Sequence, residues 1–337
     1  MKEVFLGEVI RQRRLELGLT QEELCEGICE PMTISRFENG RQTPSRNRIK
    51  ALLQRLGLPD DRFFGLLSTK EVQISNLENE IISCHVRFER AAPNEKNKIR
   101  EDTFAKHKQL ESLIDKDDTL SRQLILRSKY LLGTENGPYS LDAGLSMLLD
   151  AMHLTSPKFD LDQISRGLYT ENEIKLINNM ANCYIRAGRH YDAIDILKPL
   201  FRYLQTNLKN IPPNRAQIPM VAFNYARELE IVKRYNDAIE IAEYARKICI
   251  DYGVYTSLSG ILMILAECYY HLKDHEKSIE LYRQSYYLFK IIEDERNLAI
   301  IKTEAKKFLG LELDSTLRKK PSTTWFDGFF AFLEIVT

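Results

Sequence analysis

The sequence predicts an all-α protein in which a small domain of short helices precedes a larger domain of repeated helix pairs. Apolar residues recur at helical spacing from Leu6 to about Leu311, as expected for amphipathic helices. No alternation of Val, Ile and Thr persists long enough to predict a sheet. A pattern of paired small residues also occurs three times between residues 181 and 278, which indicates stacked helical repeats.

The composition indicates two domains and no segment for export or membrane insertion. The 337 residues exceed the size of one comfortable core. The N-terminal segment is charged throughout, and no stretch approaches the roughly 20 apolar residues that span a bilayer. We therefore expect a cytoplasmic protein with no membrane contact. Because the formal net charge is zero, any surface for nucleic acid must arise from the distribution of charge.

The sequence lacks the common patterns of catalytic and metal-binding sites. There is no Gly-rich phosphate loop, no HExxH segment and no nucleophile elbow, and the histidine spacing suggests no shared site. The six cysteines lack CxxC spacing, which favours reduced and mostly buried thiols. We therefore expect no enzyme activity, no metal and no cofactor.

Two signals define the first helices of the N-terminal domain. The first helix is predicted from Leu6 to Leu17, with Leu6, Ile10 and Leu17 on one face. Thr20 and Glu23 then form a capping box, in which each side chain accepts a hydrogen bond from the other residue's backbone amide. A second helix therefore begins directly after Thr20.

Proline and glycine place the next two helices. Pro31 fits the first turn of a third helix, which keeps the second helix short. The dipeptide Asn39-Gly40 ends the third helix, and Ser45 is the expected cap of a fourth helix that runs to Leu56. Two short helices joined by a tight turn are typical of a helix-turn-helix.

The segment LGEVIRQRRLELGLTQEELCEGICEPMTISRFENGRQTPS resembles the Cro/repressor type of helix-turn-helix. We assign residues 1–67 to a five-helix-type domain of this kind. The resemblance implies that the third helix enters the major groove of DNA. It also implies that Gln21 holds a DNA phosphate and that Arg14 pairs with Glu38. The turn carries Cys29 and is shorter than is common in that family.

Basic residues concentrate on the third helix and the segment after it, where they can neutralise DNA phosphates. Arg36 is the first candidate for base readout, because its guanidinium group fits guanine O6 and N7, and a phosphate contact is the alternative. Met32 and Thr33 offer apolar contact to thymine methyl groups. The predicted DNA-binding residues are Gln21, Met32, Thr33, Arg36, Arg41, Ser45 and Arg46.

Three segments of the larger domain share a register of small residues, which lets paired helices approach closely and resembles the tetratricopeptide repeat. The repeats are spaced by 45 and 40 residues, which exceeds the family's period of about 34. We assign residues 93–311 to a tetratricopeptide-like signal-receiving domain, with a connecting helix at 68–92. The small-residue pairs are Ala181 with Ala193, Ala226 with Ala238, and Ala266 with Ser278.

A helix-turn-helix followed by tetratricopeptide-like pairs resembles the bacterial peptide-pheromone receptors of the RNPP and Rgg group, which are PlcR/PrgX-like regulators. The turn GICEPMTISRFENG supports this resemblance. It implies a quorum-sensing transcription regulator whose concave groove holds a short linear peptide that alters dimer geometry. It also implies a homodimer on a palindromic operator of double-stranded DNA, with half-sites about 34 Å apart. The alternative is that the repeats bind a partner protein.

The first helix of each repeat is expected to line the groove, where residues three or four apart share a face. Asn side chains can satisfy the backbone of an extended peptide, and Arg186 or Arg227 could hold its terminal carboxylate. The predicted peptide-binding residues are Lys175, Asn178, Asn182, Arg186, Phe223, Arg227, Met263, Glu267 and Tyr270.

The C-terminal segment 312–337 changes character after Pro321 and holds the only Trp together with four Phe. Because exposed aromatic side chains favour aggregation, we expect this segment to dock on a surface. Four interpretations stay open: a cap over the last repeat, a tethered segment in the protein's own groove, an expression fusion and an arm that binds a partner.

Overall fold

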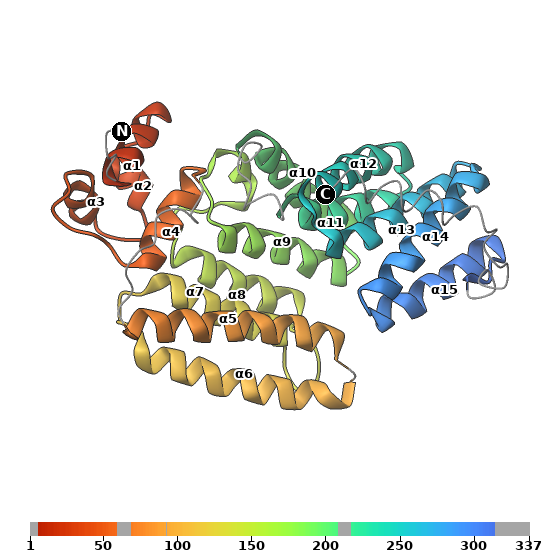
Figure 1. Ribbon diagram of the computed structural model, residues 1–337, viewed down its shortest axis with the longest axis horizontal. Coiled ribbons are helices and arrows are strands. Elements are labelled where there is room, and N and C mark those ends of the chain that lie inside the picture. Colours follow the sequence, from red (N-terminus) through yellow and green to blue (C-terminus); the bar gives the residue numbers. More distant parts are fainter. Residues whose placement is uncertain (1–5, 59–68, 92, 208–216, 314–337) are drawn as a thin grey trace, which may run out of the picture.

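The computed structural model describes residues 6–58, 69–91, 93–207 and 217–313 (Figure 1). These residues contain fifteen α-helices, one 3-10 helix and no β-strand, which confirms the predicted all-α class. None of the helices in this part of the chain is long and apolar enough to cross a bilayer. The aromatic tail at 322–337 lies outside the described residues.

The N-terminal domain has four described helices, which lie where the local signals predict them. The capping box of Thr20 and Glu23 is present, and Pro31 occupies the first turn of α3. A fifth helix of the expected domain type has no counterpart between residues 6 and 58, and residues 59–68 are not described. The helices are α1 (Leu6–Glu16), α2 (Gln21–Cys25), α3 (Pro31–Glu38) and α4 (Arg46–Arg55).

Two details of this domain correct the sequence-based expectations. Leu17 follows the end of α1 and is 41% exposed, whereas Arg14, one turn after the buried Ile10, is only 7% exposed. The buried face of α1 thus continues through Arg14 and does not include Leu17. Ser45 is the N-cap of α4 by position, but its side chain makes no capping hydrogen bond.

The larger domain begins with two helix pairs. The predicted connecting helix at 68–92 corresponds to α5 (Thr69–Arg90), which packs along α6 (Pro93–Leu113) and α7 (Thr119–Leu132). Its Ile74 and Ile81 are buried with Leu110 and Ile125, so α5 belongs to the packed body as well as connecting it. Helix α8 (Leu141–His153) pairs with α7, and a 3-10 helix, Leu161–Arg166, follows.

Three repeat pairs and a final helix complete the body. All six small residues of the predicted register are fully buried, as close helix packing requires. The Ser278 hydroxyl fits this register because it donates to the Ala266 carbonyl at 2.7 Å. The pairs are α9 (Glu171–Arg186) with α10 (His190–Asn207), α11 (Gln217–Ile231) with α12 (Tyr235–Tyr252), and α13 (Tyr255–His271) with α14 (His275–Ile291), followed by α15 (Glu295–Leu309).

The first helices of the pairs form one layer that continues to the final helix, and we call it the inner layer: α5, α7, α9, α11, α13 and α15. Arg296 at the start of α15 donates to the Glu89 carbonyl near the end of α5 at 3.3 Å. A layer whose last helix reaches its first must curve, so its free face is concave. Figure 1 shows the start of α15 turned toward the end of α5.

Candidate functional site

Helix α3 presents an open side opposite its buried side. Ile34 and Phe37 are buried in the domain core, whereas Met32 is 62% exposed and Arg36 is exposed. Half-buried Thr33 lies next to Met32 in the chain. Residues four apart share a helix face, so Met32 and Arg36 can face the same groove of DNA. The structure thus brings the predicted base-contacting residues together on the outside of the domain.

The predicted flanking contacts lie on two surfaces. Arg41 and Ser45 are exposed in the segment that joins α3 to α4. Arg46 is half-buried and lines cavities that α4 shares with the larger domain. Arg46 therefore faces the body of the protein, and its contact with DNA stays a prediction.

A buried ion pair supports α3 from behind. Arg14 donates to both carboxylate oxygens of Glu38, at 2.7 and 2.8 Å, and to the Leu19 carbonyl at 2.8 Å. The hydrogen bond to Glu38 raises the pKa of Arg14. Gln21 also donates to Glu38, at 2.7 Å. The expected pairing of Arg14 with Glu38 is present, and the side chain proposed to hold a phosphate is positioned by the same carboxylate.

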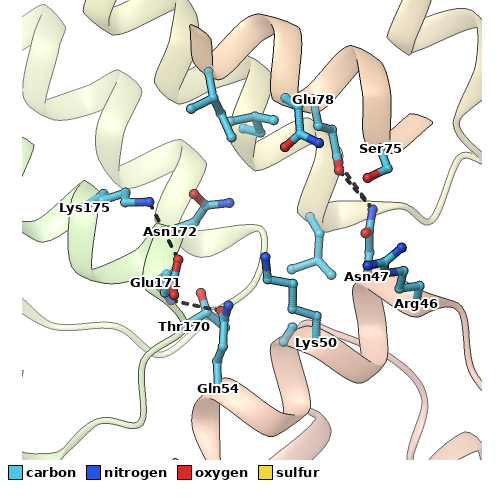
Figure 2. A pocket seen from close by; sticks show the side chains of 15 residues that line it. Arg46, Asn47, Lys50, Gln54, Ser75, Glu78, Thr170, Glu171, Asn172 and Lys175 are labelled. Atoms are coloured by element: carbon cyan, nitrogen blue, oxygen red, sulfur yellow. Dashed lines mark hydrogen bonds and ion pairs between the residues drawn. The ribbon is translucent and has the colours of Figure 1, made fainter. Parts of the chain in front are cut away.

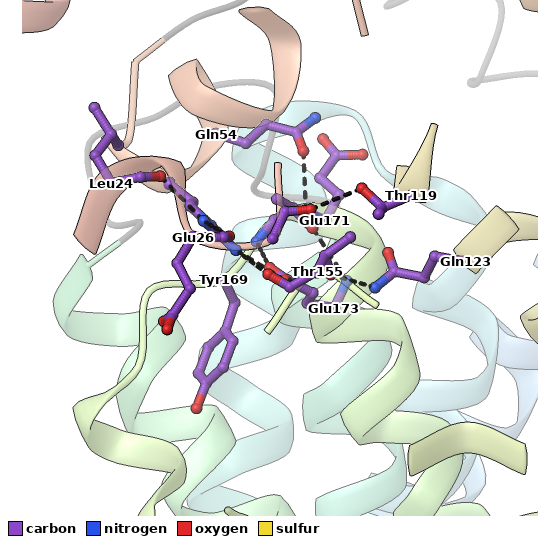
Figure 3. Close-up of polar contacts among 12 residues, drawn as sticks. Leu24, Glu26, Gln54, Thr119, Gln123, Thr155, Tyr169, Glu171 and Glu173 are labelled. Carbon is purple, nitrogen blue, oxygen red and sulfur yellow. Dashed lines mark hydrogen bonds and ion pairs between the residues drawn. The ribbon is translucent and has the colours of Figure 1, made fainter. Parts of the chain in front are cut away.

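The two domains are joined through Arg55, the last residue of α4. Figure 3 labels residues of both domains at this junction, among them Glu26 and Glu173. The Arg55 guanidinium group donates to the Leu24 and Glu26 carbonyls at 3.0 and 2.7 Å, at the end of α2. It also donates to the Thr155 carbonyl at 2.8 Å and to Glu173 at 3.2 Å, both in the larger domain. The side chains of Arg55 and Glu173 are 3% and 0% exposed. A buried charge pair therefore spans the junction.

The turn of the helix-turn-helix packs directly on this junction. Gly27 has a φ of +70°, and a Cβ atom there would lie 2.1 Å from the Thr155 carbonyl oxygen. Thr119 of α7 donates to the Gly27 carbonyl at 2.7 Å. Only glycine fits this conformation and this contact. Sequence analysis missed Arg55, Thr155 and Glu173; a glycine in the turn was the one local sign of a close approach.

A cavity of about 550 Å³ lies beside the junction, between α4, α5, α7 and α9 (Figure 2). Lys50 of α4 and Lys175 of α9 both extend into it. Asn47 on the same rim donates to Glu78 of α5 at 3.3 Å. Gln54 accepts a hydrogen bond from the Glu171 backbone amide at 3.1 Å. The cavity is thus polar and is lined by both domains.

The polar residues of α9 that were predicted to bind a peptide differ in burial and in the hydrogen bonds they already make. Asn178 is 3% exposed, and its side-chain oxygen accepts from Asn224 of α11 at 3.0 Å. Asn182 is half-buried. Arg186 is held over the Tyr130 ring and donates to the Tyr130 hydroxyl and the Asn182 carbonyl. Asn182 is therefore more open to a ligand than Asn178.

Arg227 lies within a group of carboxylates, contrary to its expected role as an anchor for a peptide carboxylate. Its guanidinium group donates to Glu267 at 2.5 Å and lies 3.9 Å from both Glu230 and Glu304. Burial raises the pKa of Glu267 to about 9, and a hydrogen bond with Glu304 adds to this effect. Two predicted peptide-binding residues, Arg227 and Glu267, thus bind each other.

The apolar residues that were predicted to bind a peptide pack against neighbouring helices of the inner layer. A Cβ atom on Gly260 of α13 would lie 2.6 Å from the Phe223 ring, so α11 and α13 approach closely at this point. Met263 is buried, and half-buried Tyr270 packs on Phe308 of α15 with ring centroids 5.1 Å apart. These side chains form an apolar stretch that continues from α11 to α15.

The exposed recognition helix and the repeat body define a helix-turn-helix DNA-binding protein with tetratricopeptide-like repeats. Residues 10–63 match the Helix-turn-helix family, and no curated protein matches the chain. The crystal structure of Bacillus thuringiensis PlcR in complex with the peptide PapR7 and DNA is 18% identical, with a TM-score of 0.53 over 88% of this chain and 98% of that one. The structure of Bacillus thuringiensis PlcR in its apo form is 17% identical in sequence, with a TM-score of 0.53 over 89% of this chain and 98% of that one. The chain shares the fold of PlcR.

We expect Glu38→Ala to destabilise the protein by about 3 kcal/mol or more, because it leaves the buried Arg14 without its partner. Glu16→Ala removes the exposed partner of Arg13 and is the matched control, with an expected cost below about 1 kcal/mol. Denaturant unfolding of the full chain measures both. Equal stability of the two variants would show that the Arg14 pair contributes no more than a surface pair.

Gly27→Ala is expected to loosen the junction, because its Cβ atom cannot coexist with the Thr155 backbone. Gly18→Ala is the matched control: Gly18 has a φ of +69° and open space around its Cβ position. Both variants share a strain of about 1–2 kcal/mol. Faster hydrogen exchange around Thr155 should appear only in Gly27→Ala. Unchanged exchange there in both variants would argue against a close-packed junction.

Glu267→Gln should flatten the dependence of stability on pH. Glu267 in the folded protein has a pKa of about 9, above the value of about 4.3 in an unfolded chain. Its stabilising contribution is therefore complete below about pH 4.3 and is lost as the pH rises to about 9. Melting temperatures at about pH 6 and about pH 9 test this, with the exposed Glu276→Gln as control. The raised pKa of Glu267 would be contradicted if the melting temperature of Glu267→Gln changed with pH as much as that of the wild type.

Proposed function

We propose that this protein is a sequence-specific DNA-binding transcription regulator controlled by a short linear peptide that binds to the inner layer. The supporting observation is one chain that carries an outward-facing recognition helix and shares, over 88% of its length, the fold of PlcR. That PlcR structure contains both a peptide and DNA. In this proposal Arg36, Met32 and Thr33 read bases, and the backbone contacts come from Gln21, Arg41, Ser45 and Arg46.

The inner layer supports an extended peptide as the ligand. Adjacent helices pack about 8–10 Å apart, so a ligand that crosses α9, α11 and α13 spans about 20 Å, which about six or seven extended residues cover. Along that path the layer offers the half-buried Asn182 and then the apolar side chains of Phe223, Met263 and Tyr270. Polar and apolar sites in sequence suit a peptide backbone with alternating side chains.

We propose further that two copies of the chain bind a palindromic operator. A single small helix-turn-helix buries too little DNA surface for tight specific binding. The effect of peptide binding on the position of α3 would pass through the Arg55 junction, because that junction links α9 to α2 and α4. The regulator would act in the cytoplasm, without catalysis and without a cofactor.

Selection from random DNA duplexes, followed by affinity measurements at several salt concentrations, tests DNA recognition. Arg36→Ala should cost about 1–3 kcal/mol on the selected sequence and relax the preference at one base position. Arg41→Ala should weaken all sequences alike and reduce the salt dependence by about one ion. Sequence preference that survives Arg36→Ala unchanged would remove Arg36 from base readout, and no selected sequence at all would contradict the proposed function.

A further inference from the structure

The turn between α2 and α3 holds two cysteines that contact each other. The Cys25 carbonyl, at the end of α2, accepts from the Ile28 amide at 2.9 Å and from the Cys29 amide at 3.1 Å. The first of these bonds closes a type II β-turn, in which Glu26 has φ −50° and ψ 123° and Gly27 has a φ of +70°. The backbone thus brings Cys29 back toward Cys25, and their thiol groups form a hydrogen bond.

This pair differs from the other four cysteines of the chain. Those four are buried, and each lies on a different helix: Cys84, Cys183, Cys249 and Cys268. Burial raises the pKa of Cys183 and of Cys249 to about 11, so these thiols stay protonated and inert at neutral pH. Cys25 is also buried, but Cys29 is partly exposed. Among all six cysteines, Cys29 is therefore the one that a small oxidant reaches from solvent.

The hydrogen bond between the two thiols makes one of them easier to ionise. It lowers the pKa of Cys25, because the Cys29 thiol donates to the Cys25 sulfur; burial opposes this effect and the charge of Arg55 adds to it. The same bond and burial raise the pKa of Cys29. The pair thus loses one proton and holds the other between its two sulfurs. When that proton passes to Cys25, the exposed sulfur of Cys29 carries the thiolate, which is the reactive form.

We propose that Cys25 and Cys29 form an oxidation site for hydroperoxides, at which a reversible disulfide displaces the recognition helix α3 and lowers the affinity for DNA. The disulfide itself goes beyond the proposed function. Its effect on DNA affinity rests on that function, so the two are tested by separate measurements.

The reaction needs a hydroperoxide as its oxidant and no other reactant. The Cys29 thiolate attacks one oxygen of hydrogen peroxide, the O–O bond breaks, and the hydroxide that leaves takes up the proton that the pair lost. The Cys25 sulfur then attacks the sulfur of the Cys29 sulfenic acid. The S–S bond forms as the S–O bond breaks, and the Cys25 proton leaves with the oxygen as water. Two thiols thus give up two electrons and two protons, and hydrogen peroxide is reduced to two water molecules.

The disulfide would contract the turn. On a helix, the Cβ atoms of residues joined by such a bond between positions four apart are about 5–6 Å apart, whereas a disulfide holds them about 3.8 Å apart. The side of the turn that faces the larger domain has no room to move, because Gly27 packs on the Thr155 backbone and its carbonyl accepts from Thr119. The displacement therefore falls on Cys29 and on Pro31, the first residue of α3.

Oxidation of the full-length protein with hydrogen peroxide, followed by alkylation of free thiols and peptide mapping by mass spectrometry, tests the site. The peptide that contains Cys25 and Cys29 should lose the mass of two hydrogen atoms, and the other four cysteines should be alkylated. Amide hydrogen exchange at the start of α3 should become faster in the oxidised protein. Affinity for the selected DNA duplex should fall about tenfold, the cost of one lost base contact, and a thiol reductant should restore it.

Three variants assign the effect to this pair. Cys29→Ser removes the exposed sulfur and should abolish both the disulfide and the response of DNA affinity to peroxide. Cys25→Ala places a smaller side chain at a buried position and should also abolish the disulfide. Cys84→Ala, at another buried cysteine, is the matched control and should respond as the wild type does. Melting curves establish that each variant is folded, and Cys29→Ser alone suffices if Cys25→Ala is not.

The outcomes separate this inference from the proposed function. Free thiols at Cys25 and Cys29 after oxidation, or sulfinic acid at Cys29 without a disulfide, would overturn the inference. A disulfide that leaves the hydrogen exchange of α3 or the DNA affinity unchanged would overturn it as well. If no DNA duplex is selected, the proposed function fails, and peptide mapping with hydrogen exchange still decides whether the disulfide forms and displaces α3.

Discussion

The buried pair of Arg55 and Glu173 is the interaction on which the arrangement of the two domains depends. Each charge would be costly inside its own domain, because a buried ion without a partner loses its hydration and gains nothing in return. Arg55 also satisfies carbonyls at the end of α2, and Glu173 also closes the capping box of Thr170 at the start of α9. Two helix ends, one from each domain, are thus completed by the same ion pair.

Because this ion pair joins residues of two domains, the sequence predicted the helices but did not predict the junction between the domains. The signals that held are short-range: the capping box at Thr20, Pro31 in the first turn of α3, and the small residues that recur twelve positions apart. Each acts within one helix or one helix pair, so its spacing is written in the sequence. Arg55 and Glu173 are 118 residues apart, and each looks locally like an ordinary helix-end residue. Only tertiary packing shows that their charges meet.

The same distinction applies to the residues that were predicted to bind a peptide. Helical periodicity correctly placed Lys175, Asn178 and Asn182 on one face of α9, because that depends on a single helix. Periodicity could not show that Arg227 is surrounded by carboxylates from α11, α13 and α15. A side chain's capacity to bind a ligand depends on what its own neighbours leave unsatisfied. The charges of the concave surface around Arg227 therefore pair with each other.

The close packing of the repeats holds α9 in place, and the start of α9 contacts the N-terminal domain. Small residues such as Ala181 and Ala193 let α9 and α10 approach closely, and the α9 start is fixed by its capping box. Glu173, which binds Arg55, lies in this first turn of α9. The turn fixed by this capping box is thus the same turn that binds the N-terminal domain. Because packed interiors resist small deformations, we expect a displacement of this turn to reach α4 through the Arg55–Glu173 pair.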